Sequence, residues 1–380
     1  MDDADPSRPR LGIIVNPLAG IGGPVALKGS DGRETVAVAR RLGAVPQAPT
    51  RAARALRALV AAGGPVELLA APGAMGADAA REAGFHVQTT SPGVAAETSA
   101  ADTRAAAAAM RDAGVELLLF AGGDGTARDI HDAIGGSVPV LGIPAGVKMH
   151  SGVFAHSPEA AAQAGAQYLN RDGRPRLRLA DIADVDEEAA RAGRVSSILY
   201  GSARVPDLPR LVLAAKSASR VNPDAALKAL CRGIAADLRP DTLYLIGPGS
   251  TTALVISALG DNATLLGVDA IRDGRVIGRD LGEQQITRLI EQSRETSLIV
   301  GLVGGQGVLF GRGNKQLGPP VLGRIPRDNI TILAAADKLL ALDPPTLWVD
   351  TGDPALDAQL QGYVRVDVAP RQQMVMRISS

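Results

Sequence analysis

The sequence predicts an α/β protein with an N-terminal domain built on a parallel β-sheet and a C-terminal domain that is β-rich or mixed α/β. In the first 150 residues, short apolar runs such as Leu11–Val15 and Leu117–Ala121 alternate with alanine-rich helical patterns. These runs lack the polar alternation of a strand with one solvated face, so they indicate strands covered on both faces by helices. Beyond Phe154 alanine becomes rarer and β-rich segments become more frequent, which predicts the change of architecture.

The N-terminal domain is expected to contain five strands separated by helices. A helix starting at Thr50 should end at Gly63 and Gly64, and Ser99 with Asp102 forms a capping box that opens another helix. A third helix is expected over Pro158–Leu169. The expected strands are Leu11–Val15, Val66–Ala70, Phe85–Thr89, Leu117–Ala121 and Val138–Ile143.

A basic segment with Gly and Pro, Arg171–Arg178, is the predicted connector between domains spanning residues 10–170 and 171–380. Helices are expected at Ala225–Leu238 and Glu283–Arg294 in the second domain. The expected strands there are Leu243–Ile246, Thr264–Val268, Leu298–Leu302, Asn329–Leu333, Leu347–Val349 and Tyr363–Val368.

Composition excludes several classes of protein. The 380 residues carry 40 basic and 40 acidic side chains, and this zero net charge argues against an electrostatic nucleic-acid binder. One Trp, four Tyr and four Phe are few for stacking nucleic-acid bases, and a single cysteine, Cys231, excludes an intrachain disulfide framework. Met1–Arg10 has no apolar signal segment, and the longest uncharged stretch, Thr242–Gly260, is broken by Gly and Pro. A cytoplasmic protein that does not bind a membrane is expected.

The strongest motif follows the run Leu117–Ala121 directly and consists of Gly122, Gly123, Asp124, Gly125 and Thr126. A glycine-rich loop between a parallel strand and a helix lets backbone amides approach phosphate oxygens. A carboxylate beside phosphates is electrostatically costly, which indicates a chemical role for Asp124. It could bind Mg²⁺ or accept a proton from an attacking hydroxyl. Thr126 and Asp129 have the spacing of a helix capping box.

Two further loops of the first domain also follow expected strands. Asn16, Gly20 and Gly22 come after the first strand and could contribute to the same phosphate site. Gly146, Lys148 and His150 come after the last one. Lys148 could neutralise a transferred phosphate, and His150 could orient the substrate.

The second domain offers two candidate substrate loops. Gly249, Ser250, Thr251 and Thr252 follow the strand Leu243–Ile246, and one of these hydroxyls is expected to cap a helix. Gly304–Gly307 and Gly311–Gln316 are glycine-rich turns, and Asn314 is their candidate for a contact with a polar ligand. Arg51, Arg54 and Arg57 are expected to form a solvated helix face, and Cys231 an inert core thiol.

Taken with Asn16-Pro17, the segment Gly122–Thr126 resembles the superfamily of NAD kinases, diacylglycerol kinases and 6-phosphofructokinases. Gly142–Gly146 and Gly249–Thr252 are similar to loops of NAD kinases, and nearly the whole chain resembles an ATP–NAD kinase branch related to acetoin-catabolism protein X. The resemblance implies ATP and Mg²⁺ as cofactors, and Asp124 as the residue that activates the 2′-hydroxyl of NAD. It implies an N-terminal α/β domain and a largely β C-terminal domain.

The sequence departs from NAD kinases where the acceptor is recognised. Met149 and His150 stand where those enzymes tend to carry Asn, and Leu199–Gly201 lacks their Asn-Glu pair. A kinase for another small molecule or a lipid, a regulator that binds nucleotide without turnover, and a sugar-phosphate isomerase therefore stay open. The donor could be ATP or polyphosphate, and a homo-oligomer is expected.

Overall fold

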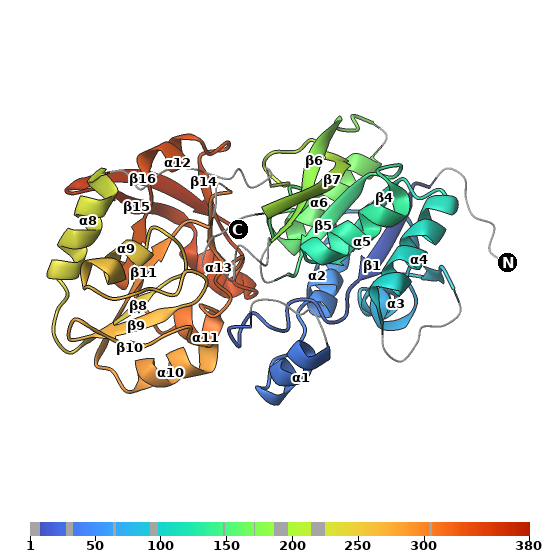
Figure 1. The fold of residues 1–380 in the computed structure, drawn as a ribbon. Helices are drawn as coiled ribbons and strands as arrows, with labels where there is room; N and C mark the ends of the chain where they lie inside the picture. The colour runs from blue at the N-terminus through green and yellow to red at the C-terminus, as the bar shows by residue number, and fades with distance from the viewer. Residues whose placement is uncertain are drawn as a thin grey trace. The chain divides into compact units, whose positions relative to one another are not determined.

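The computed structural model describes residues 8–27, 33–63, 66–91, 98–146, 149–170, 172–185, 197–213, 225–303 and 306–380 (Figure 1). The chain forms two compact units. The first contains residues 1–21 and 45–216, and the second contains residues 22–44 and 217–380.

The first unit is built on a five-stranded parallel sheet with the strand order β3-β2-β1-β4-β5. All six residues of β4 are buried, so both faces of the sheet are covered, as the absence of polar alternation predicts. The predicted parallel sheet is confirmed, although the third strand is only two residues long. The strands are β1 (Arg10–Val15), β2 (Glu67–Ala70), β3 (Gln88–Thr89), β4 (Leu117–Gly122) and β5 (Val140–Pro144).

Two pairs of helices pack on this sheet. One pair is α2 (Ala48–Ala62) and α6 (Pro158–Leu169), which contact β4 and β5; α3 (Ala77–Glu82) packs beside α2 after the short helix η1 (Gly73–Met75). The other pair is α4 (Ala100–Asp112) and α5 (Asp124–Ile134), which contact β1 and β4. The predicted capping box of α4 is present, since the Ser99 amide donates to Asp102 Oδ2 over 2.8 Å.

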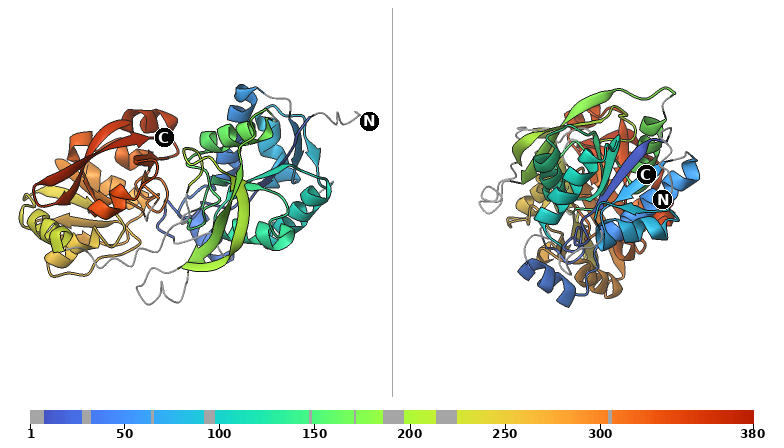
Figure 2. Two further views of the ribbon diagram at one scale, coloured as in Figure 1. Left: turned by 90° about the horizontal axis from the view of Figure 1, so that it is seen from above. Right: turned by 90° about the vertical axis from the view of Figure 1, so that its right-hand side faces the viewer.

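An antiparallel hairpin completes the first unit. Its strands, β6 (Leu177–Val185) and β7 (Ser197–Pro206), appear as a long green pair in Figure 2 and contact α5 and β5. Because this hairpin packs on the first sheet, the structure divides near residue 216 rather than at the predicted boundary of 170/171.

The second unit contains a nine-stranded mixed sheet with the order β10-β9-β8-β11-β13-β15-β16-β14-β12, which confirms the predicted mixed architecture. Strands β8, β11, β13 and β15 run parallel, whereas β9, β10 and the β15–β16 pair are antiparallel additions. The strands are β8 (Thr242–Ile246), β9 (Asp269–Arg272), β10 (Arg275–Gly278), β11 (Glu295–Gly301), β12 (Val308–Phe310), β13 (Ile330–Leu333), β14 (Thr346–Val349), β15 (Gly362–Ala369) and β16 (Gln372–Ser379).

Alternate residues of β8 face two separate cores. Tyr244 and Ile246 pack with α8 and α9, whereas Leu243 and Leu245 belong to the core that includes α10 and α11. The sheet is therefore covered on both faces. The helices of this unit are α1 (Arg33–Arg41), α8 (Ala225–Ala236), α9 (Ala253–Ala258), α10 (Glu283–Glu291), α11 (Pro319–Leu322), η2 (Arg327–Asn329), α12 (Ala336–Leu340) and α13 (Pro354–Leu360).

The predicted strand Thr264–Val268 is wrong. These residues form a turn, and β9 begins only at Asp269. The buried Asp269 carboxylate accepts the Thr264 amide over 2.7 Å and the Asp280 amide over 3.0 Å, which holds the turn before the strand. Within the described ranges, no helix has both the length and the apolar character needed to cross a bilayer.

Gly142 in β5 is a sensitive point of the first core. An added Cβ would lie 2.6 Å from Phe154 Cε1 and 2.9 Å from Phe120 Cζ, two rings that already pack edge to face. We expect Gly142→Ala to lower the free energy of unfolding by about 1–3 kcal/mol through overpacking, measured by urea denaturation. Gly165→Ala in α6, whose Cβ would meet side chains only at 3.6 Å or more, is the control and should not destabilise the unit. Equal effects of both substitutions would contradict this packing.

Candidate active site

Three loops of the first unit meet at one edge of its sheet. Strands β1, β4 and β5 are parallel neighbours, so their carboxyl ends lie at the same edge, where ligands bind in such folds. Asn16 follows β1, Gly123 follows β4, and Ala145 with Gly146 follows β5.

The loop after β4 turns directly into α5. Gly123 is the N-cap residue, and Asp124 is the first residue of the helix. The predicted capping box of Thr126 and Asp129 is therefore wrong, because Thr126 already lies inside the helix. Its hydroxyl accepts a hydrogen bond from Asn16 Nδ2 over 3.1 Å, and Asp129 pairs with Arg104 over 2.6 Å.

The loop after β5 lies directly against the loop after β4. The Ala145 and Gly146 amides both donate to the Gly122 carbonyl oxygen, over 3.0 and 2.9 Å. An added Cβ on Gly146 would lie 2.7 Å from Gly123 Cα, so this backbone approach requires a residue without a side chain. Gly122 is restricted similarly, since a Cβ there would collide with the Thr126 side chain.

Asp124 lies in the centre of this arrangement and is only 3 % exposed. Its Oδ2 accepts the His150 amide over 2.5 Å, and its Oδ1 accepts the Ser151 amide over 3.1 Å and the Ser151 hydroxyl over 2.6 Å. The predicted site residues Asn16, Gly122, Gly123, Thr126 and Gly146 belong to the loops that meet at the start of α5. His150 joins them through its backbone.

Burial raises the pKa of Asp124 to about 6 because the ionised carboxylate loses water. The hydrogen bonds from Ser151 and His150 lower the pKa, and the nearby Asp184 carboxylate raises it further. The result is a carboxylate that can exchange a proton near neutral pH, which is what a general base requires.

Ser151 is a site residue that the sequence did not reveal. It is fully buried, and besides Asp124 its Oγ contacts Ala183 in β6, accepting the Ala183 amide over 3.1 Å. A serine beside a histidine carries no pattern that distinguishes it from other loop residues. Only the fold shows its contact with Asp124.

The remaining predicted residues of these loops differ in their contacts, and not all of them lie in the first unit. Asn16 Oδ1 accepts the Leu18 amide over 3.1 Å, and Gly20 has a positive φ of 83°. A Cβ on Gly125 would meet nothing within 4 Å, so this residue faces open space. Gly22 belongs to the second unit, and Lys148 lies outside the described residues.

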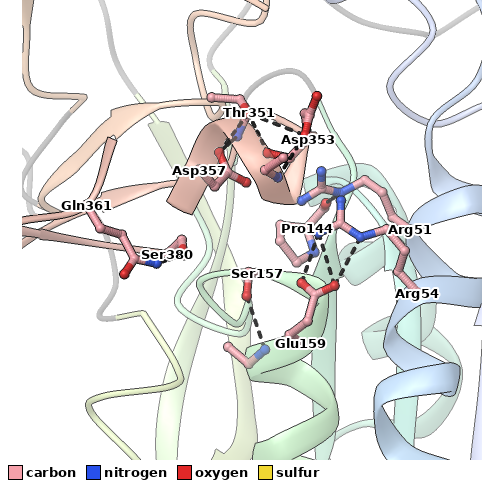
Figure 3. Close-up of polar contacts among 12 residues, drawn as sticks. Arg51, Arg54, Pro144, Ser157, Glu159, Thr351, Asp353, Asp357, Gln361 and Ser380 are labelled. Carbon is pink, nitrogen blue, oxygen red and sulfur yellow. Dashed lines mark hydrogen bonds and ion pairs between the residues drawn. The ribbon is translucent and has the colours of Figure 1, made fainter. Parts of the chain in front are cut away.

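The arginines of α2 do not form a uniform solvated face, as the sequence suggested. Arg51 is only 6 % exposed and its Nε donates to the Pro144 carbonyl at the end of β5 (Figure 3). Arg54 pairs with Glu159 through two contacts of 3.0 Å, and Arg57 pairs with Glu82 at the surface. Arg51 therefore supports the loop that contacts Gly123.

In the candidate loop Gly249–Thr252 of the second unit, the Thr252 hydroxyl bonds to nearby backbone carbonyls. Thr252 is fully buried and its Oγ1 lies 2.7 Å from the Gly247 carbonyl oxygen and 3.0 Å from that of Gly249. Ser250 is exposed, and among the described contacts neither its hydroxyl nor that of Thr251 makes a hydrogen bond. Ser250 and Thr251 stay predicted substrate contacts.

Asn314 is fully buried in the second unit. Its Oδ1 accepts the Gly311 amide over 2.9 Å, and its Nδ2 donates to the Leu309 carbonyl over 2.8 Å. These bonds shape the turn after β12, and a contact with substrate stays a prediction. Gly304 and Gly305 of the neighbouring turn lie outside the described residues.

Within the described ranges, no group of three His, Cys, Asp or Glu side chains could hold a metal ion. Mg²⁺ nevertheless often binds through one or two carboxylates together with substrate phosphates. Asp124 does not fit that mode as it stands, because it is 3 % exposed and both of its carboxylate oxygens accept hydrogen bonds from the protein.

Comparisons with known families match two segments of the chain. Residues 11–173 match the model of the ATP-NAD kinase N-terminal domain, and residues 240–378 match that of the ATP-NAD kinase C-terminal domain. None of the curated proteins matches the chain. The first segment contains the three loops around Asp124, and the second contains Gly249–Thr252 and Asn314.

The raised pKa of Asp124 predicts a specific pH dependence of stability. Asp124 binds a proton more tightly in the folded state than in the unfolded chain. Its contribution to the free energy of unfolding therefore falls as pH rises from about 4 to about 6. A shift of about two units corresponds to about 3 kcal/mol. We expect Asp124→Asn to gain about this much stability relative to wild type between pH 4 and 7, measured by urea unfolding.

Asp112→Asn is the matched control, because Asp112 is exposed and Arg111 lowers its pKa. This variant should not gain stability relative to wild type as pH rises. Parallel pH curves for wild type and Asp124→Asn would contradict the buried, proton-binding carboxylate.

Proposed function

The chain belongs to the ATP-NAD kinase family, and on that basis we propose that it transfers the γ-phosphoryl group of ATP to a hydroxyl of NAD, forming NADP. The acceptor oxygen attacks the γ-phosphorus and its proton passes to a carboxylate oxygen of Asp124. The bond to the β–γ bridging oxygen breaks, and ADP leaves with its electron pair. One observation carries the proposal: a buried carboxylate with a pKa near 6 at the meeting point of three glycine-containing loops.

The position of Asp124 supports its role as the base. It is the first residue of the eleven-residue helix α5, whose amino end favours negative charge and presents backbone N–H groups. A bound phosphate near this helix end would raise the pKa of Asp124 further and so favour proton uptake from the acceptor.

The loops around Asp124 supply the phosphate site in this proposal. Gly125 faces open space, so its backbone can be approached closely, and Gly122 and Gly123 keep side chains away from the strand ends. Asn16 and Thr126 link the β1 loop to α5. Positioning and electrostatic stabilisation supply most of the catalysis in phosphoryl transfer, and fixed loops provide both.

Mg²⁺ supplies charge neutralisation between the β- and γ-phosphates when bound. Such an ion would enter with ATP and be held by its phosphates and by water, because both Asp124 oxygens accept hydrogen bonds from the protein. Lys148 would add a cation.

In this proposal the acceptor-recognition segment is Leu199–Gly201, which lacks the Asn-Glu pattern of NAD kinases. Leu199 and Tyr200 of β7 are exposed, and the Tyr200 ring lies 5.1 Å from the Arg128 guanidinium carbon. Arg128 also reaches Asp184 over 3.4 Å. An aromatic ring and a guanidinium would bind a planar group by stacking, where an Asn-Glu pair would bind hydroxyls.

A regulator that binds nucleotide without turnover is the second candidate. The hydrogen bonds of Asp124 favour this candidate, because both of its carboxylate oxygens are already occupied by donors from within the protein. Binding of ATP and NAD in calorimetry without any product would support it over the kinase.

The proposed activity is tested by incubating the purified protein with Mg²⁺, ATP or polyphosphate, and a panel of acceptors. The panel contains NAD, NADH, a diacylglycerol in micelles and hexose phosphates, and products are identified by mass spectrometry. We expect NADP from ATP and NAD. Phosphorylation of another acceptor alone would correct the substrate, and no product from any acceptor would contradict the kinase.

Gly146→Ala is expected to weaken catalysis by separating the two loops. Its Cβ would meet Gly123 Cα at 2.7 Å, so the β5 loop must move relative to Asp124. Displacement on the scale of an ångström can cost about 100-fold in rate, and we expect kcat to fall by about that factor. Gly233→Ala in α8, where a Cβ meets nothing, is the control and should keep full activity. Unchanged kcat in Gly146→Ala would contradict the role of this contact.

A further inference from the structure

We propose that Ser151 is a positioning residue for Asp124, which anchors the carboxylate to strand β6 through its hydroxyl. This inference rests on the proposed function, since it assigns Ser151 to the same catalytic site. Ser151 itself does not contact ATP or the acceptor. It acts through Asp124.

The contacts of Ser151 join three separate elements. Its backbone amide and hydroxyl both contact Asp124 Oδ1 on α5, over 3.1 and 2.6 Å. The same hydroxyl accepts the Ala183 amide over 3.1 Å and lies 2.9 Å from the Ala183 carbonyl oxygen. Ser151 therefore connects the β5 loop, the start of α5 and β6 at one atom.

Ala183 lies at an irregular point of the hairpin. The pairing of β6 with β7 shifts register between Ile182 and Ala183, so that Ile182 faces Gly201 and Ala183 faces Leu199. Such bulges commonly redirect backbone groups or side chains next to active sites. Here both polar backbone groups of Ala183 meet the Ser151 hydroxyl.

The hydroxyl has one proton but two oxygen acceptors within reach. It can donate to Asp124 Oδ1 while that carboxylate is ionised, since a charge-assisted bond is the stronger one. After Asp124 has taken the proton of the acceptor, the hydroxyl can turn to the Ala183 carbonyl without losing a hydrogen bond. The Ser151 hydroxyl thus holds the orientation of the ionised carboxylate, and the Ser151 amide remains bonded to Oδ1 when the hydroxyl turns.

The Ser151 hydroxyl is the side-chain donor among the described hydrogen bonds of the carboxylate. The other two donors, the His150 and Ser151 amides, belong to the backbone and survive substitution. Removal of the hydroxyl should therefore loosen the orientation of Oδ1 while the loop remains in place. The effect is expected in kcat rather than in substrate binding, because Ser151 is fully buried.

The test compares Ser151→Ala and Ser151→Cys with the control Ser157→Ala. Ser157 is also buried in the first unit, but its hydroxyl accepts the Ala160 amide over 3.1 Å as the N-cap of α6 (Figure 3). We expect Ser151→Ala to lower kcat about 30-fold, less than the roughly 10²–10⁴-fold that loss of a general base costs, with KM values for ATP and acceptor within about threefold. Ser157→Ala should keep wild-type kcat.

Ser151→Cys keeps the shape of the side chain with a somewhat larger atom and replaces the hydroxyl by a weak donor. It decides the question if the alanine variant does not fold. It too should lose kcat at nearly unchanged KM. A kcat within threefold of wild type in the folded Ser151 variants, while Asp124→Asn is inactive, would overturn the proposal.

Amide hydrogen exchange tests the anchor without any activity. Peptides that contain Ser151 and Ala183 should exchange about tenfold faster in Ser151→Ala than in wild type or in Ser157→Ala. If wild type phosphorylates no acceptor, the proposed function fails and this measurement alone decides the anchor. Unchanged exchange in Ser151→Ala would then refute it.

Discussion

The backbone contact between Gly123 and Gly146 is the constraint on which the candidate site depends. It brings the loops after β4 and β5 together, with the Ala145 and Gly146 amides bonded to the Gly122 carbonyl. Further along the chain, the His150 and Ser151 amides donate to Asp124 at the start of α5. A side chain at this contact would separate the loops, so the small residues determine where the carboxylate lies.

Enclosing Asp124 has a cost that fits a catalytic role. A carboxylate that is 3 % exposed loses hydration, and three hydrogen bonds offset this only in part, since its pKa still rises to about 6. If the residue at this position had only a structural role, the folded protein would be more stable with an uncharged side chain there. Proteins retain such perturbed groups mainly at functional sites, which agrees with the family to which the chain belongs.

Sequence patterns predicted those parts of the fold that depend on local order. The buried runs of β1 and β4 and the glycines around Asp124 were recognisable because apolar periodicity and backbone freedom are properties of neighbouring residues. Ser151 and the buried Arg51 were not, since each depends on a partner distant in sequence, Ala183 or Pro144. The late start of β9 depends on bonds of the Asp269 side chain, which hydropathy does not indicate. Thr126 does not cap a helix because α5 begins at Asp124, and its hydroxyl instead meets Asn16 from the loop after β1.

The proposed role of Asp124 as the group that accepts the proton during phosphoryl transfer is tested most directly by single-turnover kinetics. The rate of ³²P transfer from γ-labelled ATP to the accepted hydroxyl is measured for wild type and Asp124→Asn at saturating substrates. We expect a rate about 10²–10⁴-fold lower in the variant, with ATP still bound. A transfer rate within tenfold of wild type in the folded variant would contradict this role.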